Sequence, residues 1–288
     1  MSVFLTRFAF PTEDEEYAFT MAEKRTCFNT FYPFGLIPPM GIKEIGFAPV
    51  TILYGGNGSG KTTVLNIIAE KLCLRRDALF NRSTFFEDYV EMCRAELTRE
   101  IPADGRIITS DDVFDYMLGV RAINEGVDLH REDMVKAYYQ HRETPFEFRS
   151  MEDYGRLKEV NAARRSTYSS FLRQTVPENV RERSNGESAF GYFVGKMEEN
   201  GLYLLDEPEN SLSPAKQQEL VQFIEDSVRF FGCQFVIATH SPFLLALREA
   251  KIYDLDARPV QVRRWTELPA VQAYHDFFRK HQKEFEQD

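Results

Sequence analysis

The sequence has few cysteines, and no two of them form a C-x-x-C pair. The four are Cys27, Cys73, Cys93 and Cys233, spread over most of the 288 residues. Scattered thiols of this kind are typical of reduced packing residues in a cytosolic protein. We therefore expect neither a disulfide framework nor a metal site built from cysteine.

Long apolar runs and an excess of basic residues are also missing. No run approaches the length of a membrane span, and the first residues lack the pattern of a signal peptide, so we expect a cytoplasmic protein without a membrane partner. The 35 Lys and Arg are outnumbered by 45 Asp and Glu, which gives a net charge of −10 and a pI near 5.2. This balance argues against a generally basic nucleic-acid binder, although a dimer could still form a local basic groove.

One complete motif is present, a glycine-rich phosphate loop. The residues Gly55-Gly56-Asn57-Gly58-Ser59-Gly60-Lys61-Thr62 fit the pattern G-x-x-x-x-G-K-[ST]. The apolar run 50–54 precedes the loop and a helix-like run 62–74 follows it, which is the context that this motif requires. Backbone N–H groups of such a loop close around a β-phosphate, helped by the positive end of the following helix. Lys61 is expected to reach the β- and γ-phosphates, and the Thr62 hydroxyl to hold Mg²⁺.

A second motif is an apolar strand that ends in two carboxylates. Residues 202–205 are Leu-Tyr-Leu-Leu, and Asp206 and Glu207 follow. A buried strand that ends at the phosphate site can present Asp206 to the Mg²⁺ shell, with Glu207 placed to orient and deprotonate the attacking water. The alternative interpretation is a strand that ends in a solvated acidic turn. The phosphate loop earlier in the chain favours a catalytic role for the two carboxylates.

A third motif, Ser184-Asn185-Gly186-Glu187, precedes an apparent helix start. Ser184 with Glu187 fits a capping box. The same exposed helix start could bind the γ-phosphate of a second nucleotide through the Ser184 hydroxyl and the Gly186 N–H. Gly186 matters for that role because a side chain would keep the backbone away from phosphate.

The fourth motif is a strand followed by histidine. The apolar run 235–239 leads to His240, and Ser241 and Pro242 suit the N-cap and first turn of a helix. The carboxyl end of a parallel strand is where α/β sheets place ligand contacts, so we expect His240 to contact the γ-phosphate. The other histidines lie in polar helical stretches and are expected to be solvated.

Changes in composition and periodicity along the chain predict three structural parts. Residues 1–74 form the first part of an α/β core with an N-terminal antiparallel portion, in which residues 3–10 are expected to form an edge strand. Residues 75–180 are mainly helical and read as an insertion or lobe, and residues 181–288 return to the core. Near the end we expect a small hairpin from 252–255 and 260–265, then an amphipathic helix from about 270 to 286.

Taken in chain order, the phosphate loop, the Ser-x-Gly-Glu motif at 184–187, the apolar strand with Asp206 and Glu207, and the strand with His240 resemble the layout of ABC-type ATPase domains. The stretches Leu-Leu-Asp-Glu-Pro-Glu-Asn-Ser-Leu-Ser-Pro (204–214) and Ala-Thr-His-Ser-Pro (238–242) are similar to soluble ATPases labelled "AAA family ATPase", which are related to RecF, SMC and OLD-type proteins. The resemblance covers about 32–75 and 184–256. It implies a P-loop NTPase fold with a mainly parallel sheet.

The resemblance also implies a head-to-tail homodimer that binds ATP with Mg²⁺. Each site takes Gly55 to Thr63, Asp206, Glu207 and His240 from one protomer, and Ser184 to Glu187 from the other. Residues 211–213 fall between the two sites. Asn185 replaces a glycine of the family signature. Where the family carries a metal-shell glutamine, this chain offers only Asp111 or Asp112. Tyr32 or Phe34 is the expected stacking partner of adenine.

The sequence thus predicts an ATP hydrolase whose cycle drives or gates a process with DNA or a second protein, by analogy with DNA repair or phage (antiviral) defence. Two alternatives stay open. One is the nucleotide-binding subunit of an ABC transporter, and the other is a dimerisation switch that binds ATP without turnover.

Overall fold

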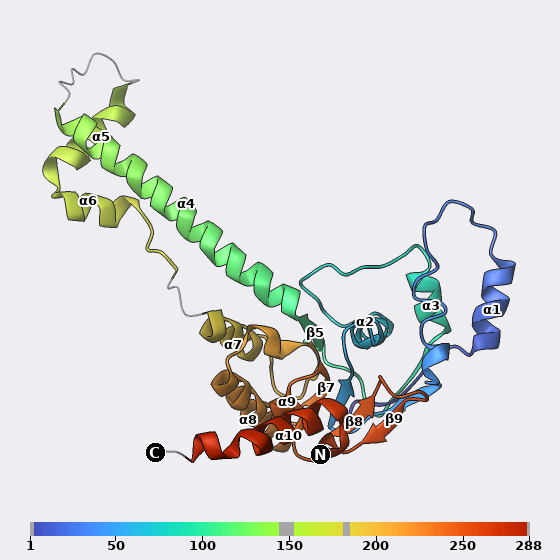
Figure 1. Ribbon diagram of the computed structural model, residues 1–288. Helices are drawn as coiled ribbons and strands as arrows, with labels where there is room; N and C mark the ends of the chain where they lie inside the picture. The colour runs from blue at the N-terminus through green and yellow to red at the C-terminus, as the bar shows by residue number, and fades with distance from the viewer. Residues whose placement is uncertain (1–2, 144–152, 181–184, 287–288) are drawn as a thin grey trace. The chain divides into compact units, whose positions relative to one another are not determined.

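The computed structural model describes residues 3–143, 153–180 and 185–286 (Figure 1). Its strands are β1 (Leu5–Ala9), β2 (Glu44–Gly46), β3 (Val50–Tyr54), β4 (Arg94–Leu97), β5 (Arg106–Thr109), β6 (Leu202–Asp206), β7 (Gln234–Thr239), β8 (Lys251–Asp254) and β9 (Gln261–Arg263). Its helices are α1 (Glu13–Ala22), α2 (Lys61–Lys71), α3 (Phe86–Met92), α4 (Ser110–Glu143), α5 (Tyr154–Arg165), α6 (Tyr168–Thr175), α7 (Asn185–Gly195), α8 (Pro214–Phe230), α9 (Pro242–Leu245) and α10 (Pro269–Phe285), with short 3-10 turns η1 (Pro38–Met40), η3 (Pro208–Ser211) and η4 (Trp265–Glu267).

The larger sheet has the strand order β5-β6-β7-β3-β8-β9 within the described residues. Every neighbouring pair is parallel except β8 and β9, which form the predicted terminal hairpin. Strands β3, β6 and β7 are buried at each position, which is why they read as continuous apolar runs rather than alternating ones. With the small antiparallel sheet β2-β1-β4, the chain has the predicted P-loop α/β fold.

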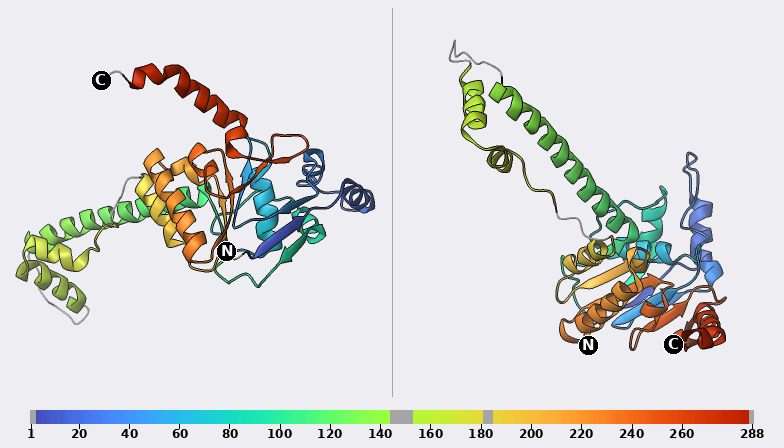
Figure 2. Two further views of the ribbon diagram at one scale, coloured as in Figure 1. Left: turned by 90° about the horizontal axis from the view of Figure 1, so that it is seen from below. Right: turned by 60° about the vertical axis from the view of Figure 1, so that its left-hand side comes forward.

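Helix α2 lies between the two sheets and is buried on nearly all sides. Its apolar residues share one core with Phe4 and Phe8 of the N-terminal segment and with Leu204 and Val236 of β6 and β7. The larger sheet separates α2 from α7 and α8 (Figure 2, left). The helix that follows the phosphate loop is therefore fixed from both sides, and so is the loop that leads into it.

The N-terminal strand corrects one expectation. We predicted an edge strand at residues 3–10, but β1 is the middle strand, because β2 pairs with one side of it and β4 with the other. Strand β4 is short and mostly exposed, so the sequence has no apolar pattern that would predict it. The fully buried side chain of Gln234 ties β1 to the larger sheet. Its Oε1 accepts from the N–H groups of Phe4 and Leu5, and its Nε2 donates to the carbonyls of Leu5 and Ala48.

The chain divides into two compact units. One comprises residues 1–114 and 185–288, and the other residues 115–184. This division differs from the predicted lobe of 75–180, because α3, β4 and β5 pack with the sheets. Within the second unit, Tyr138, Ala163 and Phe171 form a small buried cluster that joins α4, α5 and α6.

Among the described residues, no helix is both long and apolar enough to cross a lipid bilayer. The cysteines are all free thiols: Cys93 and Cys233 are buried, and Cys27 and Cys73 are exposed.

Candidate functional site

Three of the four motifs meet at the carboxyl end of the parallel strands of the larger sheet. Strand β3 ends at Tyr54, directly before the phosphate loop. Tyr54 lies opposite Thr239, the last residue of β7. Asp206 ends β6 and lies opposite Ala238 of β7. Because parallel strands end at the same edge, the loop, the two carboxylates and His240 come together there.

The phosphate loop is built on glycines at positions that restrict side chains. Gly58 and Gly60 have φ of +79° and +92°, which L-residues rarely adopt. A Cβ on Gly55 would lie 2.5 Å from the Ser59 hydroxyl and 2.7 Å from its Cβ. Gly56, Asn57 and Gly58 are exposed, so the outer turn of the loop is open to a ligand.

Lys61 is buried, with 4% exposure, in the first turn of α2. Its ammonium donates to the carbonyls of Gly55 (2.8 Å) and Gly56 (3.0 Å) and lies 3.3 Å from the Glu207 carboxylate. The loop carbonyls therefore hold the Lys61 ammonium at a position where a phosphate group would compete for it.

Asp206 is buried, and its Oδ1 has no hydrogen-bond partner. Burial raises the pKa of Asp206 to about 6, against the opposing effect of a hydrogen bond with Thr62. An unpaired buried carboxylate oxygen beside a hydroxyl is a suitable donor set for a hard cation such as Mg²⁺. Among the described residues, no group of three or more His, Cys, Asp or Glu side chains could hold a metal ion by itself, this site included.

Glu207 follows with a backbone in the left-handed region, at φ 47° and ψ 53°. This conformation is costly for glutamate and turns the chain sharply after β6. Burial alone would raise the pKa of Glu207, but a hydrogen bond from Asn210 and the charge of Lys61 outweigh it and lower the pKa. The carboxylate is therefore ionised near neutral pH, as a proton acceptor must be.

Glu209 was not singled out from the sequence as a site residue, yet it organises the histidine segment. One of its oxygens accepts from the Thr239 hydroxyl (2.5 Å) and from the N–H groups of His240 (2.9 Å) and Ser241 (3.2 Å). His240, half-exposed, places its Nδ1 3.4 Å from Glu209 and 3.9 Å from Glu207. No local pattern pairs residue 209 with residues 239–241, because the contact joins segments about 30 residues apart.

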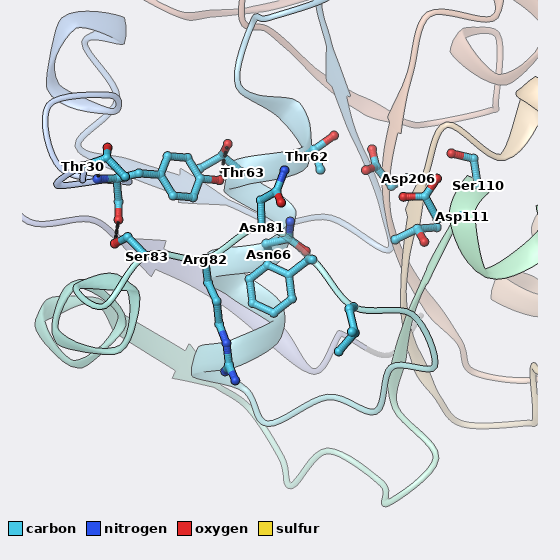
Figure 3. A pocket seen from close by; sticks show the side chains of 14 residues that line it. Thr30, Thr62, Thr63, Asn66, Asn81, Arg82, Ser83, Ser110, Asp111 and Asp206 are labelled. Atoms are coloured by element: carbon cyan, nitrogen blue, oxygen red, sulfur yellow. Dashed lines mark hydrogen bonds between the residues drawn. The ribbon is translucent and has the colours of Figure 1, made fainter. Parts of the chain in front are cut away.

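A cavity of about 830 Å³ opens beside the loop (Figure 3). Thr62, Thr63 and Asp206 line it together with Asp111, and Figure 3 shows the two carboxylates at the same end. Asp112 is buried instead, and accepts from the N–H groups of Ala78 and Thr109 and from the Thr109 hydroxyl. Of the two aspartates considered from the sequence, only Asp111 faces this cavity.

The signature stretch is described in part. Ser184 lies outside the described residues, so its predicted capping and phosphate roles stay predictions. Glu187 is exposed on the first turn of α7. A Cβ on Gly186 would lie 3.7 Å from the carbonyl oxygen of Ser211 and 3.9 Å from the N of Ser213. The start of α7 therefore adjoins residues 211–213.

The two aromatic candidates for base stacking differ in their surroundings. Phe34 stacks on Phe19 with ring centroids 4.8 Å apart and meets the edge of Tyr89. The hydroxyl of Tyr32 donates to Thr63 (2.9 Å), next to the loop. Tyr32 therefore lies beside the start of α2, next to the phosphate loop, whereas one face of Phe34 is already covered by Phe19.

The buried Asp206 carboxyl predicts a pH-dependent stability. Its folded pKa of about 6 exceeds the ordinary value of 3.8, so the folded state holds this proton more tightly. Below pH 3.8 the carboxyl is protonated in both states and does not lower the free energy of unfolding. The free energy of unfolding then falls as pH rises from 3.8 to about 6. In metal-free buffer, the free energy of unfolding of Asp206→Asn should exceed that of wild type by about 3 kcal/mol at pH 8, and by little at pH 4. Urea unfolding at both pH values measures this, and a pH-independent difference would contradict it.

Comparison with known proteins agrees with the motifs. Residues 113–246 match the family model described as "AAA domain, putative AbiEii toxin, Type IV TA system". The match runs through both carboxylates and His240, and it confirms the predicted resemblance to AAA family ATPases. Together with the phosphate loop, it supports an ATP-binding ATPase. No curated protein matches the sequence significantly.

Solved structures give only distant likenesses. An SMC head domain of Pyrococcus furiosus with an extended coiled coil is 14% identical, with 81% of this chain and 94% of that chain covered and a TM-score of 0.39. An SMC head domain from Thermotoga maritima is 11% identical over 91% and 99%, with a TM-score of 0.35. A metal-chelate type ABC transporter described as inward-facing is 13% identical over 96% and 90%, with a TM-score of 0.41. Scores this low establish no residue role in this chain.

Proposed function

We propose that this protein hydrolyses ATP with Mg²⁺ in a site shared by two copies arranged head to tail. The observation that carries the proposal is the buried Lys61 ammonium, 3.3 Å from the Glu207 carboxylate and beside Asp206, whose Oδ1 is unpaired. A cation for phosphate, a donor set for Mg²⁺ and an ionised base meet within one phosphate loop. These are the parts that phosphoryl transfer to water needs.

Each residue has a distinct task. The loop N–H groups of Gly58 to Thr63 would bind the phosphates, and Lys61 would leave the Gly55 and Gly56 carbonyls for the β- and γ-phosphate oxygens. Glu207, released from Lys61 by the same exchange, would orient and deprotonate the attacking water. His240, fixed through its backbone by Glu209, would contact the γ-phosphate. Mg²⁺, held by Thr62 and Asp206, would supply charge neutralisation.

The partner copy would complete the site with its Ser184, Gly186 and Glu187 at the start of α7. Within one copy, Gly186 packs against residues 211–213, which the family resemblance places between the two sites. This packing supports a place for the start of α7 at the interface between the copies. A shared site makes hydrolysis depend on association, so ATP would close the dimer and hydrolysis would release it.

The output of the cycle would act on a second protein or on DNA, because the sequence shows no second catalytic constellation. The matched family model names a toxin of a toxin–antitoxin system. That name is compatible with a role in cellular or phage defence, which we include in the proposal at the level of analogy.

The first test is phosphate release by the purified protein with ATP and Mg²⁺. We expect steady turnover that stops when EDTA removes the metal. Binding of ATP without any turnover would instead favour a dimerisation switch, and co-purification with a membrane subunit would favour a transporter.

The shared site has its own test in mixed variants. Lys61→Ala removes the phosphate cation from one half-site, and Ser184→Arg blocks the other half. Each variant alone should be inactive, whereas an equimolar mixture should recover about a quarter of wild-type activity, because half of the dimers are mixed and each carries one intact site. A mixture as inactive as its parents would refute the shared site.

A further inference from the structure

A carboxylate outside the four motifs contacts the phosphate loop. The N–H of Gly56 donates to the Asp256 Oδ2 at 2.8 Å, across 200 residues of sequence. Asp256 lies just beyond the end of β8, the neighbour of β3 in the sheet. The loop therefore has a support that comes from the other strand beside β3.

The contact falls on a particular peptide unit. The Gly56 N–H and the Gly55 carbonyl belong to the same planar peptide. Asp256 holds its N–H, and Lys61 holds its carbonyl at 2.8 Å. In the proposed reaction Lys61 leaves this carbonyl for phosphate. From that moment, of these two contacts, only the one to Asp256 still fixes the orientation of the peptide.

The turn that carries Asp256 is itself well fixed. The N–H of Leu255 donates to the Tyr54 carbonyl (2.8 Å), at the last residue before the loop. The buried Asp254 carboxylate accepts from the N–H groups of Asp256 (3.1 Å) and Ala257 (3.3 Å) and lies 3.4 Å from Arg263 of β9. The support is therefore rigid enough to transmit an orientation to the loop.

The same turn is linked to the far end of the loop through Met40. The N–H of Val260 donates to the Met40 carbonyl at 3.0 Å, and Pro259 packs against Gly41. The Met40 side chain in turn lies against Gly60, 3.4 Å from where a Cβ would be. The segment from residue 255 to 260 thus contacts the loop directly at Gly56 and is linked to Gly60 through Met40.

We propose that Asp256 is a positioning residue of the nucleotide site, which keeps the Gly55–Gly56 peptide in its binding orientation once Lys61 turns to phosphate. This inference rests on the proposed function, and it deepens it by assigning loop geometry to a residue that none of the motifs contains. Asp256 acts through the backbone, so an acceptor oxygen is needed there and the negative charge is not. A charge so close to phosphate would by itself weaken ATP binding.

The test compares Asp256→Ala, which removes the acceptor, with Asp256→Asn, which keeps it without the charge. In Asp256→Ala, the dissociation constant and KM for ATP should rise about tenfold, the scale of one hydrogen bond, with kcat nearly unchanged. Asp256→Asn should bind ATP at least as well as wild type. Asp104→Ala, which removes another loop carboxylate paired with an exposed arginine, is the matched control and should change neither value.

A second readout needs no nucleotide. In the free protein, amide hydrogen exchange of the segment 55–61 should be faster in Asp256→Ala than in wild type, and at the wild-type rate in Asp256→Asn. Unchanged exchange in Asp256→Ala, or equal loss of ATP binding in both variants, would overturn the proposal, as would tighter binding in both. If wild type binds no ATP, the proposed function fails, and the exchange rates still decide the role of Asp256.

Discussion

Replacing Glu207 by Gln should lower kcat for ATP hydrolysis by about 10²–10⁴-fold, the usual contribution of a general base. The amide is nearly isosteric and its oxygen can still accept from Asn210, which donates at 2.9 Å to the native carboxylate. What is lost is the negative charge that, in the proposed mechanism, accepts the proton of water. Although burial opposes them, the hydrogen bond from Asn210 and the charge of Lys61 lower the pKa of Glu207. The carboxylate therefore carries this charge near neutral pH.

Binding of ATP should persist in this variant. The Lys61 ammonium is paired with the Glu207 carboxylate at 3.3 Å, so removal of that charge leaves the ammonium freer to bind phosphate. Equilibrium binding and steady-state phosphate release, measured on the same samples, separate the two effects. Glu219→Gln, an exposed glutamate paired with Lys216 on α8, is the control and should behave as wild type. Equal phosphate release from wild type and Glu207→Gln would show that another group activates water.

Replacing Gln234 by Met should lower the free energy of unfolding by about 3–5 kcal/mol, because each buried backbone group left unpaired costs about 1–3 kcal/mol. Met keeps the length of the side chain and fills the space. It cannot accept from the N–H groups of Phe4 and Leu5 or donate to the carbonyls of Leu5 and Ala48. The loss falls on the junction between the two sheets, where the side chain has no exposure to water that could replace these bonds.

Urea unfolding followed by circular dichroism measures this change. Gln222→Met serves as the matched control, since Gln222 is exposed on α8 and bonds only to Asp226 among the described contacts. Its stability should remain within about 0.5 kcal/mol of wild type. A Gln234→Met protein as stable as this control would mean that the small sheet is held mainly by its apolar contacts with α2.

The sequence predicted what contiguous residues decide. Lys61 and Thr62 follow a glycine pattern that is typical of a tight loop between a strand and a helix, and the structure has that arrangement. Asp206 and His240 each end an apolar run, and such runs become parallel strands because both of their faces must be covered. The meeting of these residues at one sheet edge follows from the fold class alone.

The tertiary structure decided which distant groups meet. The choice between Asp111 and Asp112, the burial of Glu209 under the histidine segment and the contact of Asp256 with Gly56 all depend on strand order and register. The central place of β1 depends likewise on its pairing with the weakly patterned β4. Sequence patterns record the periodicity and chemistry of one segment. Contacts between segments arise from packing that satisfies buried polar groups across the whole core, and no local pattern encodes that requirement.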